Sequence, residues 1–128
     1  MATIRKRRPQ PFEDIRVWQE ARTLVKTVYE VAAGFPKLEE YGMASQLRRA
    51  VVSIAANIAE GARRETARDF AHFLNMAEGS AAEVKNYIVL AGDLGYIAPQ
   101  PMAALLTLLG QLLSHLYHFR VEVEQGKG

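Results

Sequence analysis

Four segments of the chain carry apolar residues at every third or fourth position. This spacing places the apolar residues on one side of an α-helix, and no segment shows the period-two alternation of a half-exposed strand. The first segment runs from Asp14, a candidate N-cap, to Gly34, a candidate residue just beyond a helix C-terminus. The pattern therefore predicts an all-α fold.

The second and third segments have apolar seams with heptad spacing. The second segment starts at Met43, and its seam consists of Ala44, Leu47, Val51, Ile54 and Ile58. The third is capped by Thr66 and ends near Gly95, and its seam consists of Phe70, Phe73, Ala77, Val84, Ile88 and Ala91. We expect two long helices that pack along these seams.

The fourth segment follows Pro99 and Pro101, and Pro101 suits the first turn of a helix. Its seam consists of Met102, Leu105, Leu109, Leu112, Leu116, Phe119 and Val123. Four helices with short connections favour an up-down-up-down antiparallel four-helix bundle, which we place at residues 12–125. Residues 1–11 are predicted to form a basic, flexible N-terminal arm.

The fourth segment is more apolar than a single seam requires. Leu106, Leu108, Leu113 and Tyr117 lie beside the seam. Either this helix is deeply buried in the bundle, or its extra face forms a subunit interface. We favour the interface, because each helix of a four-helix bundle keeps one exposed side.

Residues 94–119 contain no Asp, Glu, Lys or Arg, which raises the question of a membrane span. Prolines and polar residues interrupt this stretch well before it reaches the roughly 20 apolar residues that a spanning helix needs. We expect a core helix and no membrane partner.

The charge of the chain is concentrated at its N-terminus. The 128 residues include 16 Lys and Arg against 14 Asp and Glu, and Arg5, Lys6, Arg7 and Arg8 supply four of the basic ones. The remaining 12 basic residues do not outnumber the acidic ones, so a nucleic-acid interface on the bundle would require a local basic patch. The chain has no cysteine, which excludes disulfides and thiol chemistry and suits a cytoplasmic protein.

Residues that could support catalysis or metal binding are sparse. His115, His118 and Glu122 could lie along one side of a helix, and Asp69 with His72 is the closest match to the carboxylate–histidine pairs of di-metal bundles. Asp69 is already explained by its place in the first turn of a helix. We expect no enzymatic activity, no metal and no cofactor.

A polar stripe runs along the second segment. It consists of Gln46, Arg49, Ser53, Asn57, Glu60 and Arg64. Ser and Asn are unfavourable in the middle of a solvated helix, which indicates contacts with another helix or with a ligand. For Ser53 and Asn57 we favour a structural hydrogen-bond network, with Glu83 or Asn86 as candidate partners; the two arginines could be structural or line a groove.

Arg63, Arg64 and Arg68 cluster at the junction of the second and third segments. The free N–H groups at a helix start favour an anion, so the junction is a candidate phosphate site. Glu60, Glu65 and Asp69 equal these arginines in number, and a salt-bridged corner is the alternative. Arg48 and Arg49 would join the site only if folding or oligomer symmetry brings them to the same surface.

Several groups of residues together resemble a known family. They are Phe12–Ala21, Phe35–Pro36, Glu39–Gly42, Gln46–Ala50, Ser53–Gly61, Phe73–Leu74, Ala77–Ser80, Glu83 and Leu94–Ile97. The chain resembles the ribosomal RNA (23S rRNA) intervening-sequence proteins, a family to which the accessory proteins of diversity-generating retroelements are related. The family usually has Pro where Ala55 stands, so the second helix should lack a kink here.

The resemblance implies a small bundle that assembles as a pentamer, without catalytic activity, and that binds nucleic acid and a reverse transcriptase through basic surfaces. We therefore expect a nucleic-acid-binding accessory protein whose phosphate contacts come from Arg48, Arg49, Arg63, Arg64 and Arg68. No aromatic residue is interleaved with these arginines in the sequence, so contacts should be to phosphates of RNA or DNA and not to bases. The alternative is a protein-interaction scaffold, for example for a reverse transcriptase.

Overall fold

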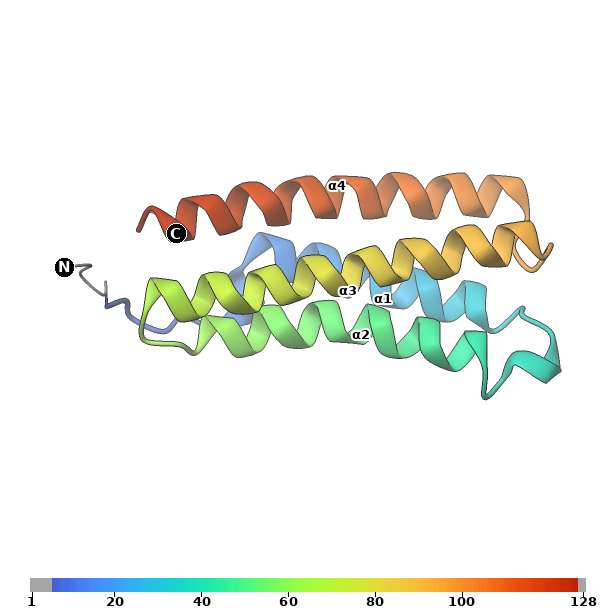
Figure 1. Cartoon of the computed structure of the whole chain (residues 1–128), viewed down its shortest axis with the longest axis horizontal. Helices are drawn as coiled ribbons and strands as arrows, with labels where there is room; N and C mark the ends of the chain where they lie inside the picture. Colours follow the sequence, from blue (N-terminus) through green and yellow to red (C-terminus); the bar gives the residue numbers. More distant parts are fainter. Residues whose placement is uncertain (1–5, 127–128) are drawn as a thin grey trace.

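The computed structural model describes residues 6–126 and contains four long helices. They are α1 (Arg16–Ala32), α2 (Met43–Ala62), α3 (Ala67–Asp93) and α4 (Pro99–Glu124). Figure 1 shows the helices side by side, with each connection at an end of the bundle, so that consecutive helices run in opposite directions. No strand forms within the described residues, which confirms the all-α prediction.

The first helix starts later than the sequence pattern predicted. Asp14 is not its N-cap: a short 3-10 helix, Phe12–Asp14, precedes α1, and Ile15 occupies the N-cap position without a side-chain hydrogen bond. The amide N–H of Ile15 donates to the carbonyl of Phe12 at 2.9 Å, which closes this turn. The turn directly after Pro11 thus displaces the helix start by one residue.

The predicted starts of α2 and α3 are confirmed. The α2 helix begins at Met43, and Glu39 rather than its N-cap residue Gly42 accepts a hydrogen bond from the Met43 amide at 3.0 Å. The Thr66 hydroxyl accepts from the Asp69 amide at 3.1 Å, which satisfies one of the free N–H groups of α3. Beyond the end of α3, Gly95 has a φ of 76°, in the left-handed region that glycine adopts readily.

The four apolar seams meet in one core. The largest fully buried side chains come from every helix and include Leu24, Leu47, Ile54, Ile58, Phe70, Leu74, Ile88, Leu105, Leu109, Leu112 and Leu116. Burying each such side chain contributes about 1.5 to 3 kcal/mol relative to leaving it in water, so the seams account for most of the drive to fold.

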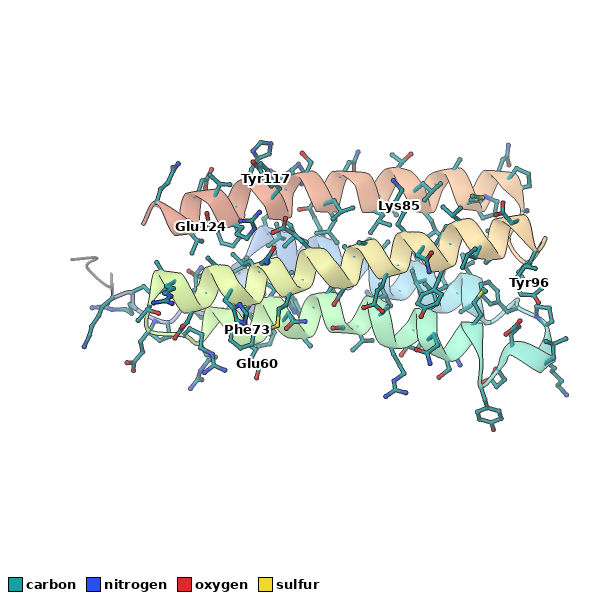
Figure 2. All side chains as sticks on the ribbon, in the orientation of Figure 1. Glu60, Phe73, Lys85, Tyr96, Tyr117 and Glu124 are labelled. Carbon is teal, nitrogen blue, oxygen red and sulfur yellow. The ribbon has the colours of Figure 1, made fainter. Side chains whose placement is uncertain are left out.

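Glu39 and Tyr96 close the end of the bundle that holds the α1–α2 and α3–α4 connections. The Tyr96 hydroxyl donates to Glu39 Oε2 at 2.9 Å, and the Tyr96 ring packs against Phe35 with 5.5 Å between ring centroids. The hydrogen bond to Glu39 raises the pKa of Tyr96. The connection between α1 and α2 is thereby tied to the one between α3 and α4. Figure 2 shows Tyr96 at this end of the bundle.

The extra apolar face of α4 is only partly covered within one chain. Leu106, Leu108 and Leu113 are half-buried, and Tyr117 remains 50% exposed. Within residues 6–126, α4 is the one helix long and apolar enough to cross a membrane by length and composition. Its seam residues nevertheless pack into the bundle core.

Candidate nucleic-acid interface

Arg63 and Arg68 flank the corner between α2 and α3. Arg63 is the C-cap residue of α2, and Arg68 is the second residue of α3. Both side chains are exposed, and neither forms an ion pair with another described residue. Their guanidinium groups are therefore available to an anion from solution.

Arg64 lies at the same corner, but its charge is engaged within the molecule. Its Nη2 atom is 3.7 Å from Glu60 Oε1, and its guanidinium lies 4.6 Å from the centroid of the Phe73 ring. Figure 2 shows Phe73 and Glu60 at this end of the bundle. Arg64 thus matches the salt-bridged alternative that the sequence left open.

Arg48 and Arg49 do not reach the corner within one chain. Arg49 and Arg63 are 14 positions apart on α2, which corresponds to about 21 Å along the helix axis. Arg48 Nη2 is 3.3 Å from Glu40 Oε1, and its guanidinium lies 6.0 Å from the Tyr29 ring centroid. Arg49 is exposed and forms no ion pair with the described residues. Fourteen positions are close to four helical turns, so Arg49 lies on the same side of α2 as Arg63 but far along the helix from the corner.

The N-terminal segment contributes to the corner, which the sequence did not reveal. Arg7 Nη1 donates to the carbonyls of Ala62 at 3.0 Å and Arg64 at 2.7 Å. Its guanidinium lies 4.2 Å from the centroid of the buried Phe70 ring, and burial lowers the pKa of Arg7. In the sequence, Arg7 is indistinguishable from its basic neighbours. Arg5, also part of the predicted arm, lies outside the described residues.

Aromatic rings do approach the arginines, although the sequence does not interleave them. Five guanidinium groups lie over rings, in the pairs Arg7–Phe70, Arg22–Trp18, Arg48–Tyr29, Arg64–Phe73 and Arg120–Tyr117. In each pair, the arginine covers one face of the ring. Two of these contacts lie within one helix, Arg22–Trp18 in α1 and Arg120–Tyr117 in α4, and Arg48–Tyr29 joins α2 to α1. The other two place Arg7 and Arg64 against rings of α3.

The polar stripe of α2 divides into a structural and an exposed part. Ser53 Oγ is 2.9 Å from Ser80 Oγ of α3, and Asn57 Nδ2 donates to the Ser53 carbonyl at 2.9 Å. The predicted network therefore exists, but its partner is Ser80. Glu83 and Asn86 were the wrong partners, because both point to solvent, while Ser80 faces α2. Gln46 and Glu60 are exposed.

The histidines of α4 lie at a small pocket. His115, His118 and Glu122 line a space of about 250 Å³ together with Ile15, Arg16, Val17 and Phe119. His115 Nδ1 is 2.7 Å from Glu20 Oε1 of α1, so this side chain joins two helices. Within residues 6–126, no group of three His, Asp or Glu residues is placed to hold a metal ion.

Comparison with known proteins places the chain in a family. The sequence profile of the 23S rRNA-intervening sequence protein family matches residues 13–118. The chain belongs to this family. No curated protein matches the chain. Among solved structures, it is similar to a protein of unknown function from the S23 ribosomal protein family of Bacteroides thetaiotaomicron, with a TM-score of 0.73 and 21% identity over 81% of this chain and 97% of that one. At this identity, the likeness supports the fold alone.

In this member of the 23S rRNA-intervening sequence protein family, many residues that carry the resemblance hold the bundle together. Gly61 lies against Phe70 and Phe73, Glu39 binds Tyr96, and Ser53 meets Ser80. Ala55 is half-buried within a continuous α2. Arg49 has no such internal role, and it remains a candidate for contact with another molecule.

Proposed function

We propose that the protein is a non-catalytic, cytoplasmic homo-oligomer that binds the phosphate backbone of RNA or DNA. One observation carries this proposal: Arg49, Arg63 and Arg68 are exposed and form no ion pair with the described carboxylates. A planar guanidinium without a competing carboxylate can donate two hydrogen bonds to one phosphate. Contacts of this kind carry little sequence information, so sequence preference should be weak.

Oligomerisation would strengthen binding by repeating these three free arginines in every subunit. The exposed residues of α4 support oligomerisation, because none of those from Pro99 to Tyr117 is acidic or basic. A helix face without charges is suited to contact with another subunit. The number five comes from the family resemblance, and a ring of five would present five copies of each free arginine.

The test is the salt dependence of binding to a short RNA or DNA duplex, measured by fluorescence anisotropy. The logarithm of the association constant should fall with log salt at about 0.9 per phosphate neutralised on DNA. The triple variant Arg49→Ala, Arg63→Ala, Arg68→Ala should bind more weakly at low salt and show a shallower slope. The matched control is Lys26→Ala, Lys37→Ala, Lys85→Ala, which removes the same charge elsewhere and should retain the slope.

Equal losses in the two triple variants would mean that only net charge matters and that the three arginines form no site. Absence of binding by the unmodified protein even at low salt would exclude the proposed function.

A protein-interaction scaffold is the second candidate. Leu38 and Tyr41, in the connection between α1 and α2, are 79% and 94% exposed. Such apolar side chains are suited to a partner polypeptide, for which a reverse transcriptase is the example given by the family resemblance. Co-elution with such an enzyme, lost in Leu38→Ser, Tyr41→Ser, would favour the scaffold.

A further inference from the structure

Residues Lys6–Gln10 lie against the corner between α2 and α3. Lys6 forms an isolated antiparallel bridge with Thr66, and the Arg7 amide donates to the Glu65 carbonyl at 2.7 Å. The Gln10 amide approaches the Ala62 carbonyl at 3.4 Å. Figure 1 shows the chain passing the α2–α3 connection before it enters α1. This segment, which we call the strap, is thus held at three points.

Arg7 anchors the strap. Its guanidinium donates to two carbonyls at the end of α2, and it also donates from Nη2 to the Gln10 side chain at 3.0 Å. Carbonyls at a helix C-terminus lack partners within the helix and carry partial negative charge, so they favour a cation. The Arg7 guanidinium also stacks on Phe70, so its Nη atoms and one of its faces are engaged within the molecule, while its Nε is buried without a hydrogen-bond partner.

The direction of Arg7 determines where its neighbours point. Side chains of an extended segment alternate between its two sides. Because Arg7 faces the bundle, Lys6 and Arg8 face away from it, and both are exposed. Neither forms an ion pair with a described residue. The strap therefore displays two free cations at the corner that already carries Arg63 and Arg68.

The balance of charge at this corner is positive once the strap is included. Glu60 is already near Arg64, which leaves Glu65 and Asp69 as the nearby carboxylates in the sequence. Asp69 lies in the first turn of α3, where the helix dipole stabilises its charge. The four free cations thus outnumber the two carboxylates that remain beside the α2–α3 connection, while Glu13 and Asp14 follow the strap in the 3-10 helix that contacts α2.

We propose that Lys6, Arg8, Arg63 and Arg68 form one binding surface for the backbone of a nucleic acid, and that Arg7 is the positioning residue that holds the strap in it. The inference rests on the proposed function and specifies where the phosphates bind. The four cations are exposed and come from two chain segments. An extended polyanion fits this arrangement better than a single enclosed anion, which would need buried, converging donors.

The experiment compares strap variants in the duplex-binding assay. Lys6→Ala, Arg8→Ala leaves the anchor intact and should reduce the salt slope by about 1.8 on DNA for each strap engaged, because two phosphate contacts are lost. Lys26→Ala, Lys37→Ala removes two exposed lysines of α1 and the following connection and should leave the slope unchanged.

Two substitutions of Arg7 separate positioning from direct contact. Arg7→Gln removes the charge, whereas Arg7→Lys keeps it but cannot donate in a fork to the Ala62 and Arg64 carbonyls. A positioning role predicts that both substitutions weaken binding and speed hydrogen exchange of the backbone amide at position 7. The helix content measured by circular dichroism should be unchanged. Binding fully retained in Arg7→Lys without a change in exchange would overturn the positioning role.

The outcomes distinguish this inference from the proposed function. If the unmodified protein binds, and the Lys6, Arg8 variant binds with the same affinity and slope, the strap is not part of the interface, and the proposed function stands. If the unmodified protein does not bind at low salt, both the proposed function and this inference are excluded.

Discussion

Position 61 has no room for a side chain. A Cβ atom on Gly61 would lie 2.8 Å from Phe70 Cδ1 and 2.8 Å from Phe73 Cβ. The absent side chain lets α2 approach α3 closely at the corner that carries the candidate interface. Elsewhere in the bundle the situation differs, since a Cβ atom on Gly79 of α3 would meet nothing within 4 Å.

These two glycines make a matched pair of substitutions. Gly61→Ala should lower the free energy of unfolding by about 1 to 3 kcal/mol, because overpacking outweighs the better helix propensity of alanine. Gly79→Ala should raise it by roughly 0.5 to 1 kcal/mol, because propensity acts alone in open space. Urea denaturation at a fixed protein concentration measures both. A stabilised Gly61→Ala would show that the corner is loosely packed.

At the scale of helices and their connections, the Glu39–Tyr96 hydrogen bond links the two connections at one end of the bundle. The pKa of Tyr96 is raised by this bond, so the folded state holds the Tyr96 proton more tightly than the unfolded chain. The contribution of the bond is fully present below about pH 10, the ordinary tyrosine value, and is lost as the pH rises through the raised folded pKa.

Tyr96→Phe should therefore destabilise the protein at pH 8 and reduce the further loss of stability between pH 8 and about pH 11. Urea midpoints at the two pH values give the comparison. Tyr41→Phe is the control, because the Tyr41 side chain is 94% exposed. An alkaline loss in Tyr96→Phe as large as in the unmodified protein would mean that the hydrogen bond does not couple stability to pH.

The elements also show what the sequence can and cannot predict. The starts of α2 and α3 were predictable because nearby residues determine them, as Thr66 does by accepting from Asp69 three positions later. The strap was not predictable, because Arg7 binds the Ala62 carbonyl 55 positions away. Among the candidate arginines, the spacing of Glu60 and Arg64 is visible in the sequence, whereas only folding brings Arg48 to Glu40 and Tyr29. Folding also places Arg64 over the Phe73 ring.

At the scale of the whole molecule, the proposed oligomer depends on the exposed outer face of α4. Exposed residues on this helix repeat at heptad spacing and carry no charge: they are Ala103, Thr107, Gly110, Ser114 and Tyr117. A Cβ atom on Gly110 would meet nothing within 4 Å, so a partner helix could approach closely at its centre. This composition matches a helix–helix interface and supports the proposed oligomer.

Thr107→Lys with Ser114→Lys should disrupt that oligomer, because two ammonium groups would lose hydration when the interface buries them. Both positions are solvent-exposed in a single chain, so the bundle itself should keep its helix content. Light scattering should give about five times the 14.3 kDa chain mass for the unmodified protein and a lower mass for the variant. Thr23→Lys on α1 is the control and should leave the mass unchanged. A variant that keeps the full mass would place the interface on another face. An unmodified protein at 14.3 kDa would exclude the oligomer. It would also exclude the repetition of the basic residues on which strong nucleic-acid binding depends.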